Sequence, residues 1–295
     1  MEHINQNSIN LNKYISNTGI CSRRDAEKLI IASRVTINEV IAKLGNRVFD
    51  DDVVKIDGRQ LQAPPKTVYI ALNKPVGIIS TTDSKERKNI IKHINYPQRL
   101  FPIGRLDKPS EGLIFLTNDG NIVNKILRAG NNHEKEYIVS VNKKITDDFV
   151  QKMANGIPIL GTITQKCTVK KVSNFVFQII LTQGLNRQIR RMCEYLNYKV
   201  TKLKRTRIMN VKLGTLKTGN WRELTLEELT QINKMIATSS KTEEASLIKQ
   251  TKKKIISRKK TSQKPTDFNK KRASFRKNSL KFRINTKPLS RKKRK

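Results

Sequence analysis

The segment Gly104-Arg105-Leu106-Asp107-Lys108-Pro109-Ser110-Glu111 is polar and runs directly into Gly112-Leu113-Ile114-Phe115-Leu116, which is apolar. An apolar run of this length after a turn is typical of a buried strand. The loop carries a carboxylate, Asp107, close to an arginine. Such an aspartate either caps its own backbone in a turn or projects a functional carboxylate, and its spacing alone favours the turn.

Further strands are predicted on both sides of this segment, and helices are fewer. The best strand candidates besides residues 112–116 are residues 68–72, 137–141 and 176–181, and helical patterns cover residues 122–127 and 189–196. Because strands dominate and do not alternate strictly with helices, the pattern indicates an α+β fold and not a doubly wound parallel sheet. The chain contains neither GxGxxG nor a Walker loop, so no nucleotide cofactor is expected.

Three other short segments combine polar residues with strand or helix ends. Lys74 lies in Asn73-Lys74-Pro75-Val76-Gly77, a turn after a strand, which is a weak signal by itself. Tyr137 ends His133-Glu134-Lys135-Glu136-Tyr137 and is equally compatible with a half-buried strand tyrosine. Gln183–Met192 opens a helix with Arg187, Arg190 and Arg191. Cations at a helix N-terminus oppose the macrodipole, so a role in binding phosphate or carboxylate explains them better than stability does.

The N-terminal residues 9–62 form a unit of about the smallest size that folds alone. Residues 10–15 open a short helix that stops at Gly19, and Ser22 is the predicted N-cap of a helix over residues 23–31, with Asp25 in a variant of the capping box. Residues 35–38 and 53–58 alternate like short strands. Four cations project from the second helix and its exit and form a candidate phosphate-binding patch, although a solvated helix face is the simpler alternative: Arg23, Arg24, Lys28 and Arg34.

The charge of the chain indicates a polyanionic partner. The 295 residues carry 61 Lys and Arg against 24 Asp and Glu, a net charge of +37. Each cation set against a phosphate releases a condensed counterion, so a nucleic acid is expected. Residues 241–295 hold 22 of the basic and 3 of the acidic residues and have no periodic apolar pattern. We therefore expect a disordered, Lys/Arg-rich tail over residues 240–295. Pro64 and Pro65 mark a linker before the large middle region.

Cysteine and histidine usage indicates neither a disulfide framework nor a metal site. Cys21, Cys167 and Cys193 are far apart, and the three histidines are equally scattered. A metal-free protein in a reducing compartment is expected. The N-terminus lacks an apolar signal region, and no run approaches the roughly 18 apolar residues of a membrane span. These features predict a soluble, cytoplasmic protein without a membrane partner.

Two family resemblances follow from these motifs. SRRDAEKLI, residues 22–30, resembles the S4-type RNA-binding domain, although Ser33 and Glu39 stand where that domain usually has glycines. GRLDKPSEGLIFLTNDG, KILRAGNNHEKEY and QGLNRQIRRM, in this order, resemble the RsuA-type pseudouridine synthases of ribosomal RNA, in particular those of the large subunit. The resemblance covers residues 9–236. It implies an S4-type domain over residues 9–62 and, over residues 66–236, a catalytic domain with a mixed, mostly antiparallel sheet.

The same resemblance implies roles for three residues. Asp107 corresponds to the nucleophile, Tyr137 to the tyrosine that stacks on the target base and accepts a proton, and Arg190 to the arginine that pairs with the catalytic carboxylate. The reaction breaks the N1–C1′ bond of uridine, turns the uracil and rejoins it through C5, so no cofactor is needed. Asp107 attacks C1′ or assists loss of the C2′ proton, and the sequence leaves both routes open. Burial would raise the pKa of such a carboxyl, and an adjacent guanidinium would lower it.

The expected partner is ribosomal RNA. The resemblance points to a stem-loop of 23S rRNA, with a transfer RNA as a second candidate, and the target base must be flipped out or single-stranded. A monomer is the default expectation. Further cations are candidates for contacts to flanking phosphates: Lys74, Arg105, Arg187, Arg191, Arg205 and Arg207. The alternative hypothesis is a non-catalytic rRNA-binding or ribosome assembly protein, which the N-terminal unit and the tail would support equally well.

Overall fold

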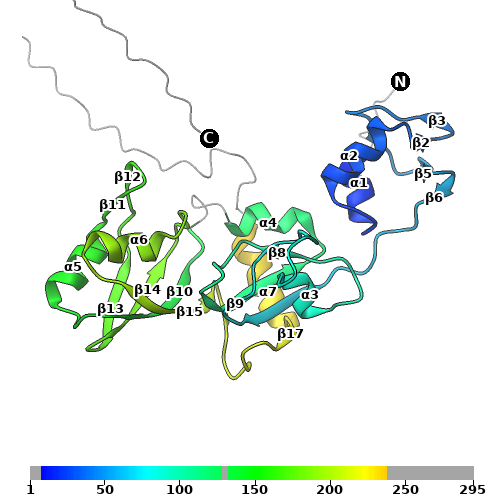
Figure 1. Cartoon of the computed structure of the whole chain (residues 1–295). Coiled ribbons are helices and arrows are strands. Elements are labelled where there is room, and N and C mark those ends of the chain that lie inside the picture. The colour runs from blue at the N-terminus through cyan, green and yellow to red at the C-terminus, as the bar shows by residue number, and fades with distance from the viewer. Residues whose placement is uncertain (1–7, 128–131, 238–295) are drawn as a thin grey trace, which may run out of the picture. The chain divides into compact units, whose positions relative to one another are not determined.

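A nine-stranded sheet lies at the centre of the larger part of the protein (Figure 1). The structure is a computed structural model that describes residues 8–127 and 132–237. The basic tail expected over residues 240–295 lies outside the described residues. In the described part of the chain, no helix is both long enough and apolar enough to cross a membrane.

The N-terminal unit packs two helices against short strands, as the sequence predicts. Its elements are β1 (Ile9–Asn10), α1 (Leu11–Asn17), α2 (Arg23–Ile31), β2 (Val35–Ile37), β3 (Val40–Ile41), β4 (Arg47–Val48), β5 (Val54–Ile56) and β6 (Arg59–Gln60). Four strands pair in the order β3-β2-β5-β6, and β1 pairs with β4. Apolar residues of both helices and of β2, β4 and β5 form one buried cluster, so this unit has its own core.

The predicted N-cap of α2 is present in the structure, but the predicted capping box is not. Ser22 caps α2 by accepting a hydrogen bond from the backbone N–H of Asp25 at 3.1 Å, as predicted. The predicted capping box is wrong, because the Asp25 carboxylate accepts the Ser22 hydroxyl at 2.6 Å instead of the Ser22 backbone N–H. Ser33 and Glu39 adopt left-handed conformations, with φ of 55° and 66°. The turns thus keep a glycine-like backbone, at a cost of about 1–2 kcal/mol per residue.

The large sheet is mixed and mostly antiparallel, which confirms the predicted fold class. Its strands are β7 (Tyr69–Lys74), β8 (Phe101–Ile103), β9 (Glu111–Thr117), β10 (Lys135–Val141), β13 (Thr168–Ser173), β14 (Val176–Leu181), β15 (Val200–Ile208), β16 (Val211–Lys212) and β17 (Trp221–Glu223). The main order is β13-β14-β10-β15-β9-β7-β17, with β8 beside β9 and β16 beside β15. Only β9 and β15 run parallel among these pairs.

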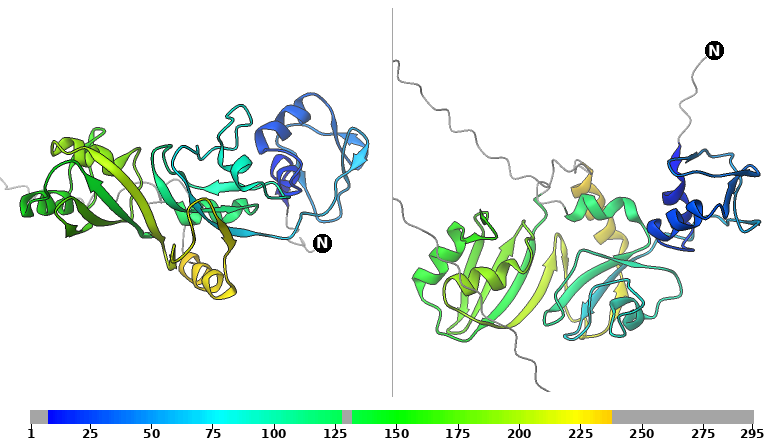
Figure 2. Two further views of the ribbon diagram at one scale, coloured as in Figure 1. Left: turned by 60° about the horizontal axis from the view of Figure 1, so that its bottom comes forward. Right: turned by 45° about the horizontal axis from the view of Figure 1, so that its top comes forward.

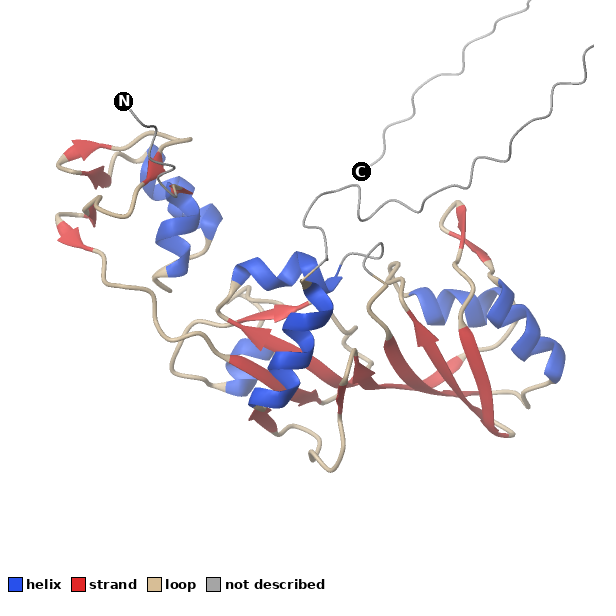
Figure 3. Cartoon of the chain, turned by 180° about the vertical axis from the view of Figure 1, so that it is seen from behind, coloured by secondary structure: helices blue, strands red, loops and turns tan. Residues whose placement is uncertain are grey.

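Helices cover different parts of this sheet (Figure 3). They are α3 (Ile90–Ile94), α4 (Gly120–Leu127), α5 (Asp147–Asn155), α6 (Gln188–Tyr195) and α7 (Leu226–Ile236), and a short hairpin is formed by β11 (Pro158–Ile159) and β12 (Thr162–Ile163). The buried faces of α5 and α6 pack against β10, β14 and β15. Those of α4 and α7 lie side by side over β7 and β9 (Figure 2).

Strands β7 and β9 are buried on both faces. Ala71, Leu113 and Phe115 pack in the cluster under α4 and α7. The alternate residues Ile114 and Leu116 pack with α3 on the opposite face. This double burial explains why residues 112–116 are continuously apolar instead of alternating. Asp107 is therefore attached to one of the most firmly packed strands of the protein.

Candidate active site

The loop that carries Asp107, residues 104–110, is pinned to its surroundings and is called the aspartate loop below. Ser80 donates its hydroxyl to the Leu106 carbonyl at 2.9 Å and accepts the Leu106 N–H at 3.2 Å. The N–H of Gly77 donates to the Lys108 carbonyl at 2.8 Å, and the N–H of Ser110 donates to the Asp107 carbonyl at 3.0 Å. The backbone of Asp107 thus begins a turn, as spacing alone suggested, but its side chain is free for another role.

The Asp107 carboxylate faces two arginines of the segment that enters α6. Its Oδ2 lies 3.5 Å from Nη1 of Arg187 and 3.9 Å from Nε of Arg190. The structure therefore brings Asp107 and Arg190 together, as the sequence predicts, and adds Arg187 to the same oxygen. Among the described residues, the Asp107 carboxylate forms ion pairs with these two guanidinium groups.

Arg190 is buried and fixed by three carbonyl or hydroxyl groups. Its guanidinium donates to the Pro109 carbonyl and to the Ser110 hydroxyl, each at 3.1 Å, and to the Val200 carbonyl at 3.4 Å. Burial lowers the pKa of Arg190, as does the charge of Arg187, whereas Asp107 raises it. The guanidinium remains cationic because its intrinsic pKa is so high. Arg190 therefore presents a fixed positive charge to Asp107 while tying the aspartate loop to β15.

Tyr137 lies at the junction of the two halves of the sheet. Its ring packs against the cluster under α5 and α6 and also against the cluster that contains Leu106 of the aspartate loop. In register, Tyr137 pairs with Arg205 on β15, and Arg205 pairs with Gly112 on β9. Tyr137 is thus two strands away from the strand that follows Asp107, and it is half-buried.

Gly112 permits the close approach of β9 to β15. A Cβ atom built on Gly112 would lie 2.2 Å from the Arg205 carbonyl oxygen and 2.6 Å from its backbone nitrogen. Its φ of 109° is also unfavourable for any side chain. Only glycine fits this position, which explains why a glycine follows the polar loop so closely.

Two predicted phosphate contacts, Lys74 and Arg205, are corrected by their burial. Lys74 is 0% exposed, and its ammonium donates to the carbonyls of Pro75 at 2.9 Å and Ser110 at 2.8 Å. Burial lowers the pKa of Lys74 to about 8. Arg205 is 4% exposed and donates from Nε to the Leu113 carbonyl at 2.6 Å. Lys74 thus holds the end of the aspartate loop and Arg205 holds β9, and neither buried cation can reach a phosphate at the surface.

Arg207 is also committed to protein groups. It donates to Glu134 at 2.9 Å, to Glu136 at 3.2 Å and to the Met209 carbonyl at 2.7 Å, with 16% of its side chain exposed. The predicted phosphate contact is therefore corrected to an ion-pair role between β15 and β10. Arg105 and Arg187 are exposed, and Arg191 is half-exposed with its guanidinium on the Asn186 carbonyl and side-chain oxygens.

In the candidate phosphate-binding patch on α2 and its exit, two of the four cations are paired with carboxylates. Lys28 pairs with Asp25 at 2.9 Å, and Arg34 forms a two-pronged ion pair with Asp57 at 2.5 and 2.8 Å. Arg23 and Arg24 are exposed at the start of α2 and take part in no ion pair among the described residues. The patch available to an anion therefore centres on Arg23 and Arg24.

Sequence reasoning missed Ser80 and Ser110, whose hydroxyls hold the aspartate loop. Ser110 lies in the aspartate loop but carries no distinguishing signal in the sequence, and Ser80 is far from this loop along the chain. The Asp107 side chain is 36% exposed, so the site is open in the absence of RNA, and a bound substrate has to exclude the water.

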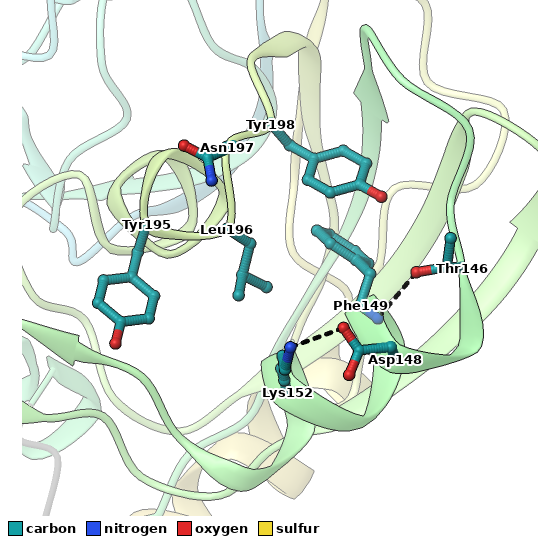
Figure 4. Close-up of a pocket in the computed structure, with 8 residues that line it drawn as sticks. All are labelled: Thr146, Asp148, Phe149, Lys152, Tyr195, Leu196, Asn197 and Tyr198. Atoms are coloured by element: carbon teal, nitrogen blue, oxygen red, sulfur yellow. Dashed lines mark hydrogen bonds and ion pairs between the residues drawn. The ribbon is translucent and has the colours of Figure 1, made fainter.

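Two pockets of the described residues lie away from the aspartate loop. One, of about 390 Å³, is formed where α6 ends and α5 begins. There the rings of Phe149 and Tyr198 lie 4.4 Å apart at an interplanar angle of 50°, beside the Lys152–Asp148 ion pair (Figure 4). The other is lined by Thr18 and Ile20 after α1 and by residues of the segment from Ile56 to Pro65. Neither includes a residue that the sequence singled out for catalysis. Among the described residues, no group of three or more His, Cys, Asp or Glu could hold a metal ion.

Comparison with known proteins gives a consistent set of matches. The family model for RNA pseudouridylate synthase matches residues 68–195. The chain is 59% identical over 235 residues to the dual-specificity RNA pseudouridine synthase RluF of Salmonella typhi, covering 79% of this chain and 81% of that protein. It is 36% identical to ribosomal large subunit pseudouridine synthase B of Bacillus subtilis, covering 75% and 94%. A solved pseudouridylate synthase structure aligns with a TM-score of 0.57 and 28% identity, covering 76% and 99%.

Proposed function

Since this chain belongs to the RNA pseudouridylate synthase family, we propose that it isomerises uridine of ribosomal RNA to pseudouridine with Asp107 as its reactive group. The observation that carries the proposal is the placement of the Asp107 carboxylate within 3.5–3.9 Å of two guanidinium groups on a pinned loop. Both guanidinium groups face the same carboxylate oxygen, Oδ2, and a carboxylate oxygen is the atom that attacks carbon or accepts a proton.

The reaction needs one carboxylate and no added reactant. The N1–C1′ bond breaks, uracil leaves as a stabilised anion, and a C5–C1′ bond forms after the ring turns. The hydrogen of C5 leaves as a proton, and N1 gains one, so product and substrate are isomers. Asp107 acts by adding to C1′ or by assisting loss of the C2′ proton. In either route the buried Arg190 presents a fixed positive charge to the carboxylate.

Tyr137 is proposed to receive the target base. A uridine inside a duplex cannot reach Asp107, so the base must be flipped out or lie in a loop. The half-buried ring of Tyr137 offers a flat face at the junction of the two clusters that border the aspartate loop. Stacking of a base on an aromatic ring contributes about 1–3 kcal/mol. Base stacking also covers the partly exposed Asp107 and removes water from it.

The remaining exposed cations are proposed to bind RNA phosphates. Arg105 lies in the aspartate loop and Arg191 in the first turn of α6. Arg23 and Arg24 belong to the N-terminal unit, which we propose is an S4-type RNA-binding domain over residues 9–62. Residues 66–236 then form the catalytic domain, and residues 240–295 form a basic tail that adds electrostatic attraction. We also propose that the protein is cytoplasmic and monomeric.

The proposed substrate is a stem-loop of 23S rRNA. Relatives 58–59% identical to this chain are named dual-specificity RNA pseudouridine synthases, which is compatible with a second RNA substrate. A transfer RNA is the candidate that we propose for that second substrate.

Tritium release from 23S rRNA transcribed with [5-³H]uridine tests this function. The protein is expected to release close to one equivalent of tritium per RNA, because C5 loses its hydrogen when the new bond forms. Release from transfer RNA transcripts tests the second substrate in the same assay. Tight binding to both RNAs without tritium release would contradict the proposal and favour the non-catalytic assembly protein.

A further inference from the structure

We propose that Arg187 is a movable phosphate anchor, which pairs with Asp107 in the RNA-free protein and transfers to an RNA phosphate beside the target uridine. The proposal rests on the proposed function, since it concerns the same site. It assigns to one residue two successive partners, the catalytic carboxylate and a phosphodiester of the substrate.

The two arginines at Asp107 differ in how firmly they are held. Arg190 has 9% of its side chain exposed and donates to three groups of the aspartate loop and β15. Arg187 has 40% of its side chain exposed, and among the described residues its guanidinium is recorded in contact with Asp107 alone. Breaking one exposed ion pair requires little free energy, because water screens the two charges and hydrates them when they separate. Arg187 is therefore the arginine that can leave.

The contacts to Asp107 are incomplete as they stand. Both guanidinium groups approach the same oxygen, Oδ2, at 3.5 and 3.9 Å, whereas a charge-assisted hydrogen bond measures about 2.7–2.9 Å. The Nε of Arg190 is buried and has no hydrogen-bond partner. An unpaired buried donor is unfavourable. A movement of Asp107 by about 1 Å towards Arg190 would give this Nε a hydrogen bond to the carboxylate. Departure of Arg187 removes the competing attraction on Oδ2 and permits that movement.

The backbone at Arg187 keeps its side chain at the entrance of the site. Arg187 is the N-cap of α6 with φ of 50°, a left-handed conformation that is unusual for arginine. The preceding residue is fixed by Arg191, whose guanidinium donates to the Asn186 carbonyl at 3.1 Å and to its side-chain oxygen at 3.3 Å. A fixed backbone with an exposed side chain allows the guanidinium to move without disturbing α6.

The charge around Asp107 favours a phosphate as the second partner. One carboxylate faces two guanidinium groups, and Arg105 and Lys108 of the aspartate loop are exposed next to it. A phosphodiester supplies the missing negative charge, and guanidinium binds phosphate oxygens with two parallel hydrogen bonds. A flipped uridine brings its own phosphates to this entrance, so the transfer of Arg187 couples RNA binding to the alignment of Asp107.

The test compares two substitutions at this position with a control. Arg187→Asn removes the charge and suits the left-handed backbone, because asparagine adopts that conformation more readily than most residues. Arg187→Lys retains a charge that can meet a phosphate. Lys171→Asn removes an equal charge from the exposed edge strand β13, outside the site. Circular dichroism and thermal melting establish that each variant is folded.

Two properties of each variant are measured: its affinity for RNA as a function of salt concentration, and the separate KM and kcat values of tritium release. Filter binding of the 23S rRNA transcript between 50 and 200 mM KCl gives the slope of log Kd against log salt. Loss of one phosphate contact reduces that slope by about 0.7–0.9. We expect this reduction for Arg187→Asn, with its loss of tritium release appearing mainly in KM, and a slope close to wild type for Arg187→Lys.

Two outcomes would overturn the inference. Arg187→Asn with the salt slope of Lys171→Asn would mean that Arg187 does not meet a phosphate. A fall in kcat with unchanged KM and slope would mean that Arg187 remains on Asp107 throughout the reaction. Absence of tritium release by the wild-type protein would instead contradict the proposed function, and the binding slopes would still decide whether Arg187 contacts RNA.

Discussion

Arg190 joins the aspartate loop, β15 and the Asp107 carboxylate through one planar group. Its donors meet the Pro109 carbonyl, the Ser110 hydroxyl and the Val200 carbonyl, while Nε faces Asp107. A lysine ammonium presents a compact charge with three donors and cannot reproduce this fork. The position of the charge relative to Asp107 therefore depends on arginine and not on positive charge alone.

Arg190→Lys is expected to lower kcat by about 100-fold, similar to the loss of one electrostatic donor in other active sites. RNA affinity should change little, because Arg190 is buried behind Asp107. Single-turnover tritium release and filter binding measure the two effects. Arg222→Lys serves as the control. It makes the same replacement in an ion pair away from the site, between Arg222 and Glu228 at the start of α7. Equal effects of both substitutions on kcat would contradict a specific role for Arg190.

Lys135 provides a test of stability against pH. Its side chain is 8% exposed, and burial lowers its pKa to about 8 from an ordinary 10.5. The unfolded chain therefore binds more protons than the folded protein between about pH 8 and 10.5, so the contribution of Lys135 to stability rises with pH in that window. The cost of burying the cation is present in full below pH 8.

Lys135→Met should remove this dependence, since methionine has a similar shape and no charge. Urea denaturation at pH 7, 8 and 9 gives the free energy of unfolding of both proteins. The difference, wild type minus variant, is expected to increase steadily from pH 8 to 9. A difference that stays constant or falls would mean that Lys135 remains fully protonated in the folded protein.

At the level of elements, the parallel pairing of β9 with β15 places the aspartate loop against α6. Gly112 lies at that contact, and a Cβ there would overlap the backbone of Arg205 at 2.2 Å. Because the obstacle is backbone in the centre of the sheet, no side-chain movement relieves it. The strand pair, and with it the distance between Asp107 and Arg190, depends on the absence of a side chain.

Gly112→Ala is expected to lower the free energy of unfolding by roughly 3 kcal/mol or more, from steric overlap and an unfavourable φ combined. Gly120→Ala is the matched control, because the nearest atom to its Cβ is 3.9 Å away and it lies at the start of α4. Thermal melting of both variants measures the effect. Similar melting temperatures would contradict the close approach of β9 to β15.

The sequence predicted those elements whose apolar residues are continuous or regularly spaced. Residues 176–181 were predicted as a strand and form β14 with the same bounds. The strand β15 was missed because its buried residues, Val200, Leu203, Arg205 and Ile208, do not follow one alternation. Register shifts in its pairing with β10 interrupt the two-residue period, and a buried arginine resembles a surface residue in sequence.

The sequence predicted part of the candidate site, and the contacts to backbone atoms were not predicted. The proximity of Asp107 and Arg190 followed from the family resemblance and is confirmed by the structure. The burial of Lys74 and Arg205 could not be predicted, because charged residues are rarely buried without a partner and their partners are backbone carbonyls. Because every residue has a backbone carbonyl, the sequence does not indicate which carbonyl accepts a hydrogen bond from a buried cation.

For the whole molecule, the net charge of +37 predicts strongly salt-dependent binding to RNA. Removal of residues 241–295, which hold 22 of the 61 basic residues, is expected to weaken RNA binding and to make its salt dependence shallower. The shortened protein should still fold, because the buried clusters of the described residues come from residues 11–236. A salt slope equal to that of the full chain would show that the tail does not contact RNA.

The role of Asp107 is tested most directly by one substitution that keeps its shape. Asp107→Asn retains the side-chain size but removes the nucleophile and proton acceptor. Tritium release from [5-³H]uridine-labelled 23S rRNA, measured together with filter binding of the same RNA, separates chemistry from recognition. We expect no tritium release by the variant at saturating RNA and a Kd within about threefold of wild type, a difference of less than about 0.7 kcal/mol. Tritium release at a rate near that of the wild-type protein would contradict the assignment of Asp107.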